Sequence, residues 1–347
     1  EGYVAKEDGT NVIYITGGHT RYEAAGLAIE AGAAIEALPI IVKPAPATPM
    51  TALLLGELLA QTDLPAGMWS VLPLANEQTA DLVADPRLPV VSFTGSETVG
   101  YHIQASQPTK HVVLELGGNA AAVVLADWSS DADLEWAATR IATFGNYQAG
   151  QSCVSVQRVL VDESVYERFV PLLVAKLEAL KTGAPTDEDV QVGPVINDAA
   201  AARIQSWIDD AVASGATLLA GGTREGTTIA PTLLSDAPAE AKVSCEEVFG
   251  PVMTIAPVAG VDAALAAVND SRFGLQAGIF THDLQVAFRA HRELVVGGVV
   301  IGDVPSFRAD QMPYGGVKSS GLGREGLRAA MTDLTHDRVM VLTGLDL

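Results

Sequence analysis

The sequence predicts a parallel α/β fold. Short apolar runs typical of strands alternate with longer segments of helical periodicity, from about residue 39 to residue 301. Strands and helices that alternate at this spacing build a parallel sheet with helices packed against it. A chain of 347 residues is long enough for two domains, and a hydrophobic fraction of 48% supports a large core. Because aromatic residues make up only 5% of the chain, that core is predicted to be aliphatic.

The elements predicted before residue 120 follow from apolar periodicity and from chain breakers. Pro44 ends a buried apolar run that finishes in Lys43, and leucines at helical spacing come after it. A glycine-containing turn at 94–100 separates a strand from a helix. The predicted strands are 12–15, 39–43, 88–93 and 112–116, and the predicted helices are 22–37, 50–61 and a segment from that turn to about 105.

After Gly118 the alternation continues with a second set of elements. Gly183 and Gly215 occupy positions where helix C-caps are expected. The tail at 338–342 is apolar enough to form an exposed strand that needs a partner. The predicted helices are 132–143, 164–181, 199–214 and 261–269, and the predicted strands are 156–161, 217–219, 252–257 and 298–301.

Composition narrows the class of protein. A net charge of -21 argues against nucleic acid and anionic membranes as partners. No apolar run is long enough to span a bilayer, and no basic-then-apolar leader opens the sequence. Two cysteines provide no disulfide framework, so we expect a cytoplasmic protein, and no metal site is predicted. The first residue is Glu1, so the N-terminus is expected to be processed or incomplete.

Cys153 is the strongest candidate for a reactive group. Small, flexible residues such as Gly150 and Ser152 precede it, and an alternating apolar run over 154–161 predicts a strand after it. A thiol on a glycine-rich turn that enters a strand is exposed enough to react and firmly held. A buried cysteine acting as a small hydrophobic residue is the alternative. The case for a nucleophile therefore depends on partners elsewhere in the chain.

The turn Thr94–Gly100 is a candidate phosphate-binding segment. Glycines let the backbone approach a phosphate, and free N–H groups at a helix start favour an anion. Ser96 can add a hydroxyl contact, although Gly-Ser before Glu97 is also an ordinary capping signal. Lys43, at the end of its predicted strand, can pair with a ribose or phosphate or can be a solvated strand-end lysine.

Two carboxylates are further candidates. Glu115 lies in an apolar strand beside glycines, where desolvation would raise its pKa and suit a general base. The alternative is an edge-strand glutamate in solvent. Glu247 precedes Phe249 by two residues, so on a strand both would point to one face, as a ribose contact beside a ring contact.

Six stretches of the chain, in this order, resemble the motifs of the aldehyde dehydrogenase superfamily. They are Ile41–Pro44, Phe93–Gly100, Leu114–Asn119, Gly150–Cys153, Glu246–Pro251 and Pro313–Glu325. The resemblance spans roughly nine-tenths of this chain, whereas usual members of the family are longer at the N-terminus. It implies a Rossmann-like cofactor domain at 1–117, an α/β catalytic domain at 118–321, and a return segment with an oligomerisation tail at 322–347. It also implies a homodimer or homotetramer.

Residue by residue, the resemblance implies a covalent oxidation. Cys153 would be the nucleophile, Glu115 the general base and Glu325 a second carboxylate that relays protons. The Cys153 thiolate would attack a small aldehyde, hydride would leave for the nicotinamide, and water activated by Glu115 would hydrolyse the thioester. The residues implied to bind NADP or NAD are Lys43, Gly95, Ser96, Glu97, Thr98, Val99, Gly100, Leu116, Glu247 and Phe249.

Three departures from the family pattern modify these expectations. Ala45-Pro46 stands where the family has Glu or Ser, which favours NADP because no carboxylate would repel a 2′-phosphate. No asparagine lies between Asn11 and Asn76, where the family's oxyanion asparagine is expected. The usual N-terminal segment of the family is also missing from this sequence. Without an asparagine amide to stabilise the oxyanion, we expect this chain alone to be about 10²–10³-fold slower than an N-terminally extended version that carries this asparagine.

The substrate and two rival functions complete the expectations. The stretch 303–313 resembles members that oxidise semialdehydes, lactaldehyde or glyceraldehyde phosphate, and its Arg308 is a candidate substrate contact or a solvated loop arginine. One rival is an acylating relative that passes the acyl group to coenzyme A or phosphate. Retention of Glu115 weighs against it, since hydrolysis needs the base. The other rival is a non-enzymatic scaffold of the same fold.

Overall fold

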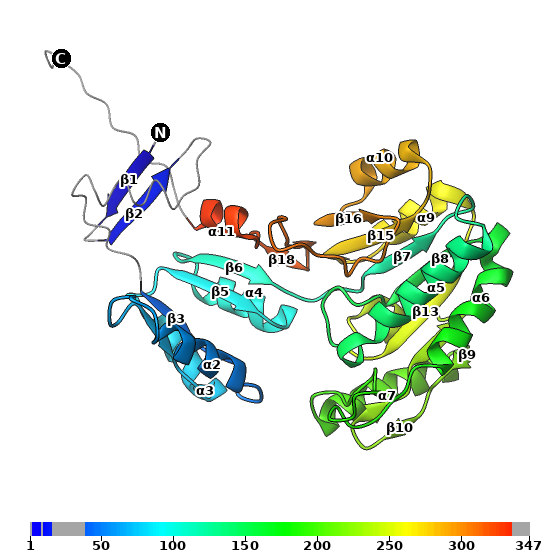
Figure 1. The fold of residues 1–347 in the computed structure, drawn as a ribbon, viewed down its shortest axis with the longest axis horizontal. Helices are drawn as coiled ribbons and strands as arrows, with labels where there is room; N and C mark the ends of the chain where they lie inside the picture. Colours follow the sequence, from blue (N-terminus) through cyan, green and yellow to red (C-terminus); the bar gives the residue numbers. More distant parts are fainter. Residues whose placement is uncertain (1, 8–9, 16–38, 335–347) are drawn as a thin grey trace, which may run out of the picture. The chain divides into compact units, whose positions relative to one another are not determined.

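The chain forms two compact units (Figure 1). The computed structural model describes residues 2–7, 10–15 and 39–334. The first unit comprises residues 1–91, 106–111 and 328–347, and the second comprises 92–105 and 112–327. Compactness does not show which ligand a unit binds, so the cofactor domain at 1–117, the catalytic domain at 118–321 and the tail at 322–347 stay predictions.

The first unit contains a parallel βαβ arrangement. Strand β3 (Ile40–Val42) pairs in parallel with β4 (Trp69–Val71), and helix α2 (Met50–Leu59) connects them. The strand predicted at 39–43 is confirmed, but its predicted burial is wrong. Ile40 is 63% exposed because β4 is the only strand paired with β3 in the described chain. The other described elements here are β1 (Gly2–Glu7), β2 (Thr10–Ile15) and α3 (Asn76–Ala84).

Two predictions for this region cannot be compared with the structure. The helix at 22–37 and the strand at 338–342 lie outside the described residues.

None of the helices that the structure describes is long and apolar enough to cross a bilayer.

The second unit is built on a seven-stranded sheet. Its strand order is β16-β15-β7-β8-β13-β12-β9, and the neighbouring pairs are parallel except β12 with β9. This parallel sheet confirms the predicted α/β class. The strands are β7 (Ala121–Val124), β8 (Arg158–Asp162), β9 (Thr217–Ala220), β12 (Thr232–Ser235), β13 (Val252–Val258), β15 (Gln276–Phe280) and β16 (Gly298–Ile301).

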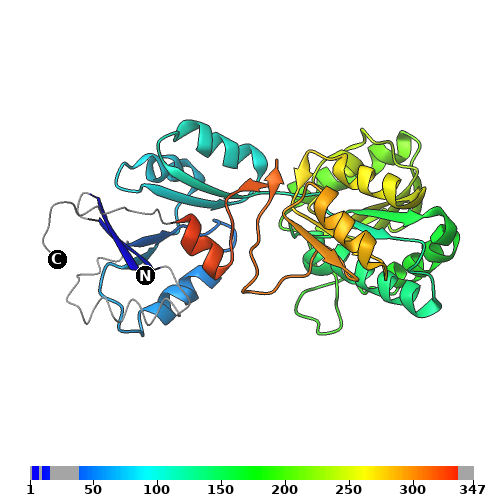
Figure 2. The same cartoon turned by 90° about the horizontal axis from the view of Figure 1, so that it is seen from above.

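Helices cover both faces of this sheet (Figures 1 and 2). Side chains that alternate along a strand point to opposite faces, and on β7 Ala122 and Val124 join one buried cluster whereas Ala121 and Val123 join another. The first cluster contains α5 (Asp131–Asn146) and α6 (Glu163–Glu178), and the second contains α9 (Gly260–Asn269) and α10 (Leu284–Glu293).

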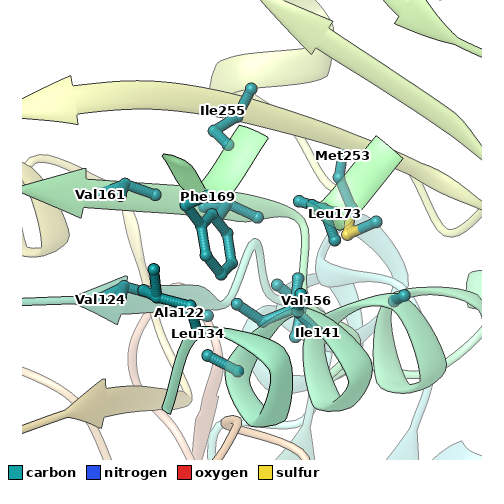
Figure 3. Packing of buried hydrophobic residues seen from close by; sticks show 14 of the residues in the cluster. Ala122, Val124, Leu134, Ile141, Val156, Val161, Phe169, Leu173, Met253 and Ile255 are labelled. Atoms are coloured by element: carbon teal, nitrogen blue, oxygen red, sulfur yellow. The ribbon is translucent and has the colours of Figure 1, made fainter. Parts of the chain in front are cut away.

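The cluster beneath α5 and α6 is closely packed. In Figure 3 the ring of Phe169 lies near Val124 and Val161, and Leu173 lies near Met253. Phe169 and Leu173 are both fully buried. Truncating a buried phenylalanine to alanine typically costs about 3–5 kcal/mol, so this cluster contributes strongly to holding α5 and α6 on the sheet.

The described residues also form a smaller sheet, which has three strands. Its order is β18-β6-β5, with β5 (Val90–Thr94), β6 (His111–Glu115) and β18 (Gly321–Leu322). The remaining elements are α4 (Glu97–Ser106), η1 (Tyr147–Gly150), α7 (Asp198–Ala213), β10 (Arg224–Glu225), β11 (Thr228–Ile229), α8 (Lys242–Cys245), β14 (Phe273–Gly274), β17 (Val317–Lys318) and α11 (Leu327–Asp333).

Of the two predicted helix C-caps, one is confirmed and the other is wrong. Gly215 follows the C-cap of α7 with φ +109°, a conformation that favours glycine, as predicted. Gly183 is not a C-cap, because α6 ends at Glu178 and Ala179 caps it. Gly183 instead donates its N–H to the carbonyl of Val192.

Candidate active site

The segment before Cys153 is a strained turn held against another backbone. Gln148 and Ala149 have φ of 51° and 56°, and Gly150 has φ of 69°. A Cβ on Gly150 would lie 2.1 Å from the carbonyl oxygen of Gly250, so only glycine fits. The thiol turn and the stretch Phe249–Pro251, more than 90 residues apart in sequence, therefore meet.

Cys153 itself lies in a small apolar cluster. It packs against Val154, Leu275 and Tyr314, and its Sγ lies 2.9 Å from the Tyr314 hydroxyl. Burial raises the pKa of the Cys153 thiol, and the nearby carboxylates of Glu247 and Glu115 raise it further. The expected thiolate therefore depends on a partner that offsets burial.

The strand predicted directly after Cys153 begins later than expected. Strand β8 starts at Arg158, and the residues from Val154 to Gln157 are all buried instead of alternating. The Gln157 amide donates to the carbonyls of Val243 and Glu246. These side-chain bonds, together with backbone hydrogen bonds from the Gln157 N–H to the Ala120 carbonyl and from the Thr254 N–H to the Gln157 carbonyl, hold the segment that precedes β8.

Glu115 is a buried carboxylate, as the apolar strand predicts. It is the last residue of β6, which lies between β18 and β5, and it is only 6% exposed. The edge-strand alternative is therefore wrong. Neither carboxylate oxygen has a hydrogen-bond partner among the described residues. Burial, reinforced by repulsion from Glu325, raises the pKa of Glu115 to about 8.

Two glycines after Glu115 bring the other groups close. A Cβ on Gly117 would lie 2.3 Å from the Glu247 carboxylate, and a Cβ on Gly118 would lie 2.7 Å from the Cys153 carbonyl. The Gly118 N–H also donates to Glu247 Oε1 at 2.9 Å. The base, the thiol and Glu247 are thus gathered around one short loop.

Glu247 and Phe249 do not share a strand face, contrary to the prediction. They lie in irregular chain between α8 and β13, since the Gly118 N–H and the Gln157 amide bind this segment in place of a strand ladder. Burial raises the pKa of Glu247. Phe249 has φ of 50° and remains 41% exposed. An acceptor carboxylate and, two residues later in the chain, an accessible aromatic ring fit the ribose and ring of a nicotinamide nucleotide.

The candidate phosphate turn is confirmed as a strand-to-helix turn. Strand β5 ends at Thr94 and α4 begins at Glu97. The Gly95 N–H donates to the Glu115 carbonyl, and Gly100 packs against Leu116, where a Cβ would lie 2.5 Å from Leu116 Cδ2. Ser96, Thr98 and Val99 are exposed on this turn.

The charged side chain of this turn, Glu97, is already in an ion pair. Arg272 binds both Glu97 and Glu246 and lies over the ring of Phe273. The backbone N–H groups and the Ser96 hydroxyl, not a free cation, are therefore what the turn offers to a phosphate. Lys43 lies in the first compact unit and is partly buried after β3, so its role at a cofactor stays a prediction.

Arg308 is not a freely solvated arginine. Its guanidinium lies 4.4 Å from the centre of the Tyr314 ring, and its Nη2 lies 2.9 Å from Glu325 Oε2. The backbones of Tyr314 and Glu325 pair through hydrogen bonds of 3.0 and 2.6 Å. The structure therefore joins Arg308 and Glu325 to Cys153 through Tyr314. Sequence reasoning missed Tyr314, whose only signal was its place in the stretch Pro313–Glu325.

Comparison with known proteins shows the family to which the chain belongs. The sequence model of the Aldehyde dehydrogenase family matches residues 26–340. A 3-sulfolactaldehyde dehydrogenase of Priestia aryabhattai is 42% identical over 304 residues, which cover 87% of this chain and 63% of the relative. The chain belongs to the aldehyde dehydrogenase family, and it spans a little under two thirds of the length of this relative.

Solved structures of the family share the fold. Aldehyde dehydrogenase 21 of Physcomitrella patens, in complex with the reaction product succinate, matches with a TM-score of 0.82 and 42% identity, over 85% of this chain and 61% of that one. The NADP-dependent glyceraldehyde-3-phosphate dehydrogenase of Bacillus halodurans, complexed with NADP, matches with a TM-score of 0.82 and 37% identity, over 88% of this chain and 63% of that one.

Proposed function

We propose that this protein oxidises a small aldehyde bearing an anionic group to its carboxylic acid, with NAD(P) as the hydride acceptor. The observation that carries the proposal is the gathering of Cys153, Glu115 and Glu247 around Gly117 and Gly118. A thiol and a carboxyl whose pKa is raised to about 8 are the two groups that a covalent oxidation followed by hydrolysis requires.

The first half of the reaction forms a thioester on Cys153. The thiol loses its proton to water, and the thiolate sulfur bonds the carbonyl carbon while the carbonyl π electrons move to oxygen. NAD(P), when bound, supplies the acceptor for the hydride, which leaves the carbon with both electrons of its C–H bond. The oxygen lone pair then restores the carbonyl, and the acyl group remains on sulfur.

The second half releases the acid. The Glu115 carboxylate takes a proton from water, the water oxygen bonds the acyl carbon, and the C–S bond breaks with its electrons returning to sulfur. The net reaction consumes an aldehyde, a water and an oxidised cofactor, and it yields a carboxylate, a reduced cofactor and two protons. Glu325, close enough to Glu115 to raise its pKa, is positioned to pass the base's proton toward solvent.

The residues that would hold the cofactor fit this role. Glu247 can accept from a ribose hydroxyl, Phe249 offers an exposed ring face, and the start of α4 offers N–H groups to a phosphate. We propose that Lys43 contacts the adenosine ribose and that Ala45-Pro46 permits NADP. A homodimer or homotetramer and a cytoplasmic location are further proposals, and light scattering after size-exclusion chromatography tests the oligomeric state.

Arg308 supports the choice of an anionic substrate. It is about two-fifths exposed and pairs with a carboxylate that a substrate anion can replace. Two relatives are named for anionic aldehydes, one bearing a sulfonate and one a phosphate, and the structure of a third holds succinate as its reaction product. These three compounds are all small and carry a negatively charged group.

A panel of small aldehydes tests the proposal. Reduced cofactor is measured with aldehydes that carry a sulfonate, carboxylate or phosphate, and with uncharged aldehydes of similar length. Cys153→Ser should abolish turnover, whereas the matched control Cys245→Ser should retain it. No reduced cofactor with any aldehyde would contradict the proposal. Turnover only when coenzyme A or phosphate is added would show the acylating reaction instead.

A further inference from the structure

Tyr314 is fixed at the reactive sulfur from several sides. Its backbone pairs with Glu325 in both directions, its side chain is 5% exposed, and it packs with Val154 and Leu275. The Arg308 guanidinium covers one face of its ring. A buried ring held in this way has little freedom to turn, so its hydroxyl stays where the fold places it.

The fold places this hydroxyl next to the sulfur of Cys153. The Tyr314 hydroxyl oxygen lies 2.9 Å from Cys153 Sγ, within hydrogen-bond distance. Either group can donate while both are neutral. Burial raises the pKa of Tyr314 far above its usual range and raises that of Cys153 as well. Because the phenol is the weaker acid, the thiol loses its proton first and the phenol then donates to the thiolate.

The charges around Cys153 make this donor important. Glu247 and Glu115 oppose a negative sulfur, and burial opposes it most. Tyr147 lies nearby, but its hydroxyl binds Ser152. Among the side chains that the structure describes, Tyr314 is the one whose hydrogen bond lowers the pKa of Cys153.

We propose that Tyr314 is a catalytic residue whose hydroxyl donates a hydrogen bond to the Cys153 sulfur and so makes the thiol reactive near neutral pH. The catalytic use of this hydrogen bond rests on the proposed function. Its effect on the reactivity of the Cys153 thiol does not. In the step concerned, the S–H bond breaks, its proton passes to water and its electrons remain on sulfur. Tyr314 keeps its own proton throughout and is neither consumed nor oxidised.

The test is Tyr314→Phe, which removes only the hydroxyl oxygen. The rate at which iodoacetamide alkylates Cys153 is measured by peptide mass spectrometry between pH 6 and pH 10. A hydrogen bond to a charged group is worth enough to shift a pKa by about one to two units. We therefore expect the alkylation profile of the variant to move up by that amount. At a pH below the Cys153 pKa of both proteins, alkylation should be about 10- to 100-fold slower in the variant than in the wild type.

Two controls separate the direct contact from general effects. Cys245, whose Sγ lies 3.5 Å from the Glu240 carbonyl, is alkylated in the same sample and should keep its profile. Tyr147→Phe removes the other phenol hydroxyl near the turn and should shift the Cys153 profile much less than Tyr314→Phe does. An unchanged Cys153 profile in Tyr314→Phe, or an equal shift in Tyr147→Phe, would overturn the inference.

Alkylation needs neither cofactor nor aldehyde, so this test is independent of the proposed function. If the wild type oxidises aldehydes and the Tyr314→Phe profile does not move, the inference fails and the function stands. If the profile moves and no aldehyde is oxidised, the inference stands and the function fails.

Discussion

Replacing Glu115 by glutamine should stabilise the protein at alkaline pH. The side chain is 6% exposed, and burial raises its pKa from 4.5 to about 8. At about 1.4 kcal/mol per pKa unit, this difference corresponds to at most about 5 kcal/mol by which the fold disfavours the carboxylate. Glutamine has nearly the same shape and carries no charge, so it removes this penalty.

The sign of the effect follows from proton binding. Between pH 4.5 and about pH 8 the native state holds the Glu115 proton more tightly than the unfolded state does. The free energy of unfolding of the wild type therefore falls as the pH rises through this window. Glu115→Gln lacks this loss, so the two proteins should be similar at pH 5, and the variant should be several kcal/mol more stable at pH 9.

Urea unfolding followed by tryptophan fluorescence measures the difference. Glu178→Gln, a change of the same kind at an exposed residue of α6, serves as the matched control and should follow the wild type at both pH values. A Glu115→Gln midpoint no higher than that of the wild type at pH 9 would refute the argument that burial holds this carboxyl neutral.

Three further predictions concern the cofactor, the substrate and the thiols. Pro46→Glu should weaken the binding of NADP relative to that of NAD by tenfold or more, about 1.4 kcal/mol. Unchanged binding isotherms would show that another residue selects the cofactor. Arg308→Gln should lower kcat/KM for anionic aldehydes by about 10- to 100-fold and spare uncharged ones, because a charge-assisted contact is lost. An equal loss for both kinds of aldehyde would argue for a structural role. In the wild type, alkylation mapped by mass spectrometry should favour Cys153 over Cys245, with bound cofactor altering the rate; the reverse order would count against Cys153.

Much of the fold was predictable because its amphipathic helices carry a clear pattern. The predicted helices 132–143, 164–181, 199–214 and 261–269 correspond to α5, α6, α7 and α9 within a few residues. Strands β7, β12 and β15 were missed. Every residue in them is buried, so they lack the alternation that marks a half-exposed strand. Helices α3, α8, α10 and α11 were also missed.

The motif residues of the site could be named from the sequence, but their relations could not. A buried Glu115 was one of two interpretations that its apolar strand left open, and the structure supports it over a solvated edge-strand glutamate. The contact between Tyr314 and Cys153 joins residues 161 positions apart, and no local pattern encodes it. The irregular path of Glu247 and Phe249 depends on a hydrogen bond that Gly118 donates and on one that Gln157 accepts, and both residues are also remote in sequence.

The most direct measurement for the central claim, covalent oxidation on Cys153 followed by hydrolysis through Glu115, is a rapid-quench experiment on Glu115→Gln. The variant is mixed with cofactor and an oxidisable aldehyde, and both reduced cofactor and intact mass are followed. We predict a burst of reduced cofactor, an acyl adduct located on Cys153, and steady-state turnover about 10²- to 10⁴-fold below that of the wild type. Equal loss of the burst and of turnover, or an adduct on any other residue, would contradict the account.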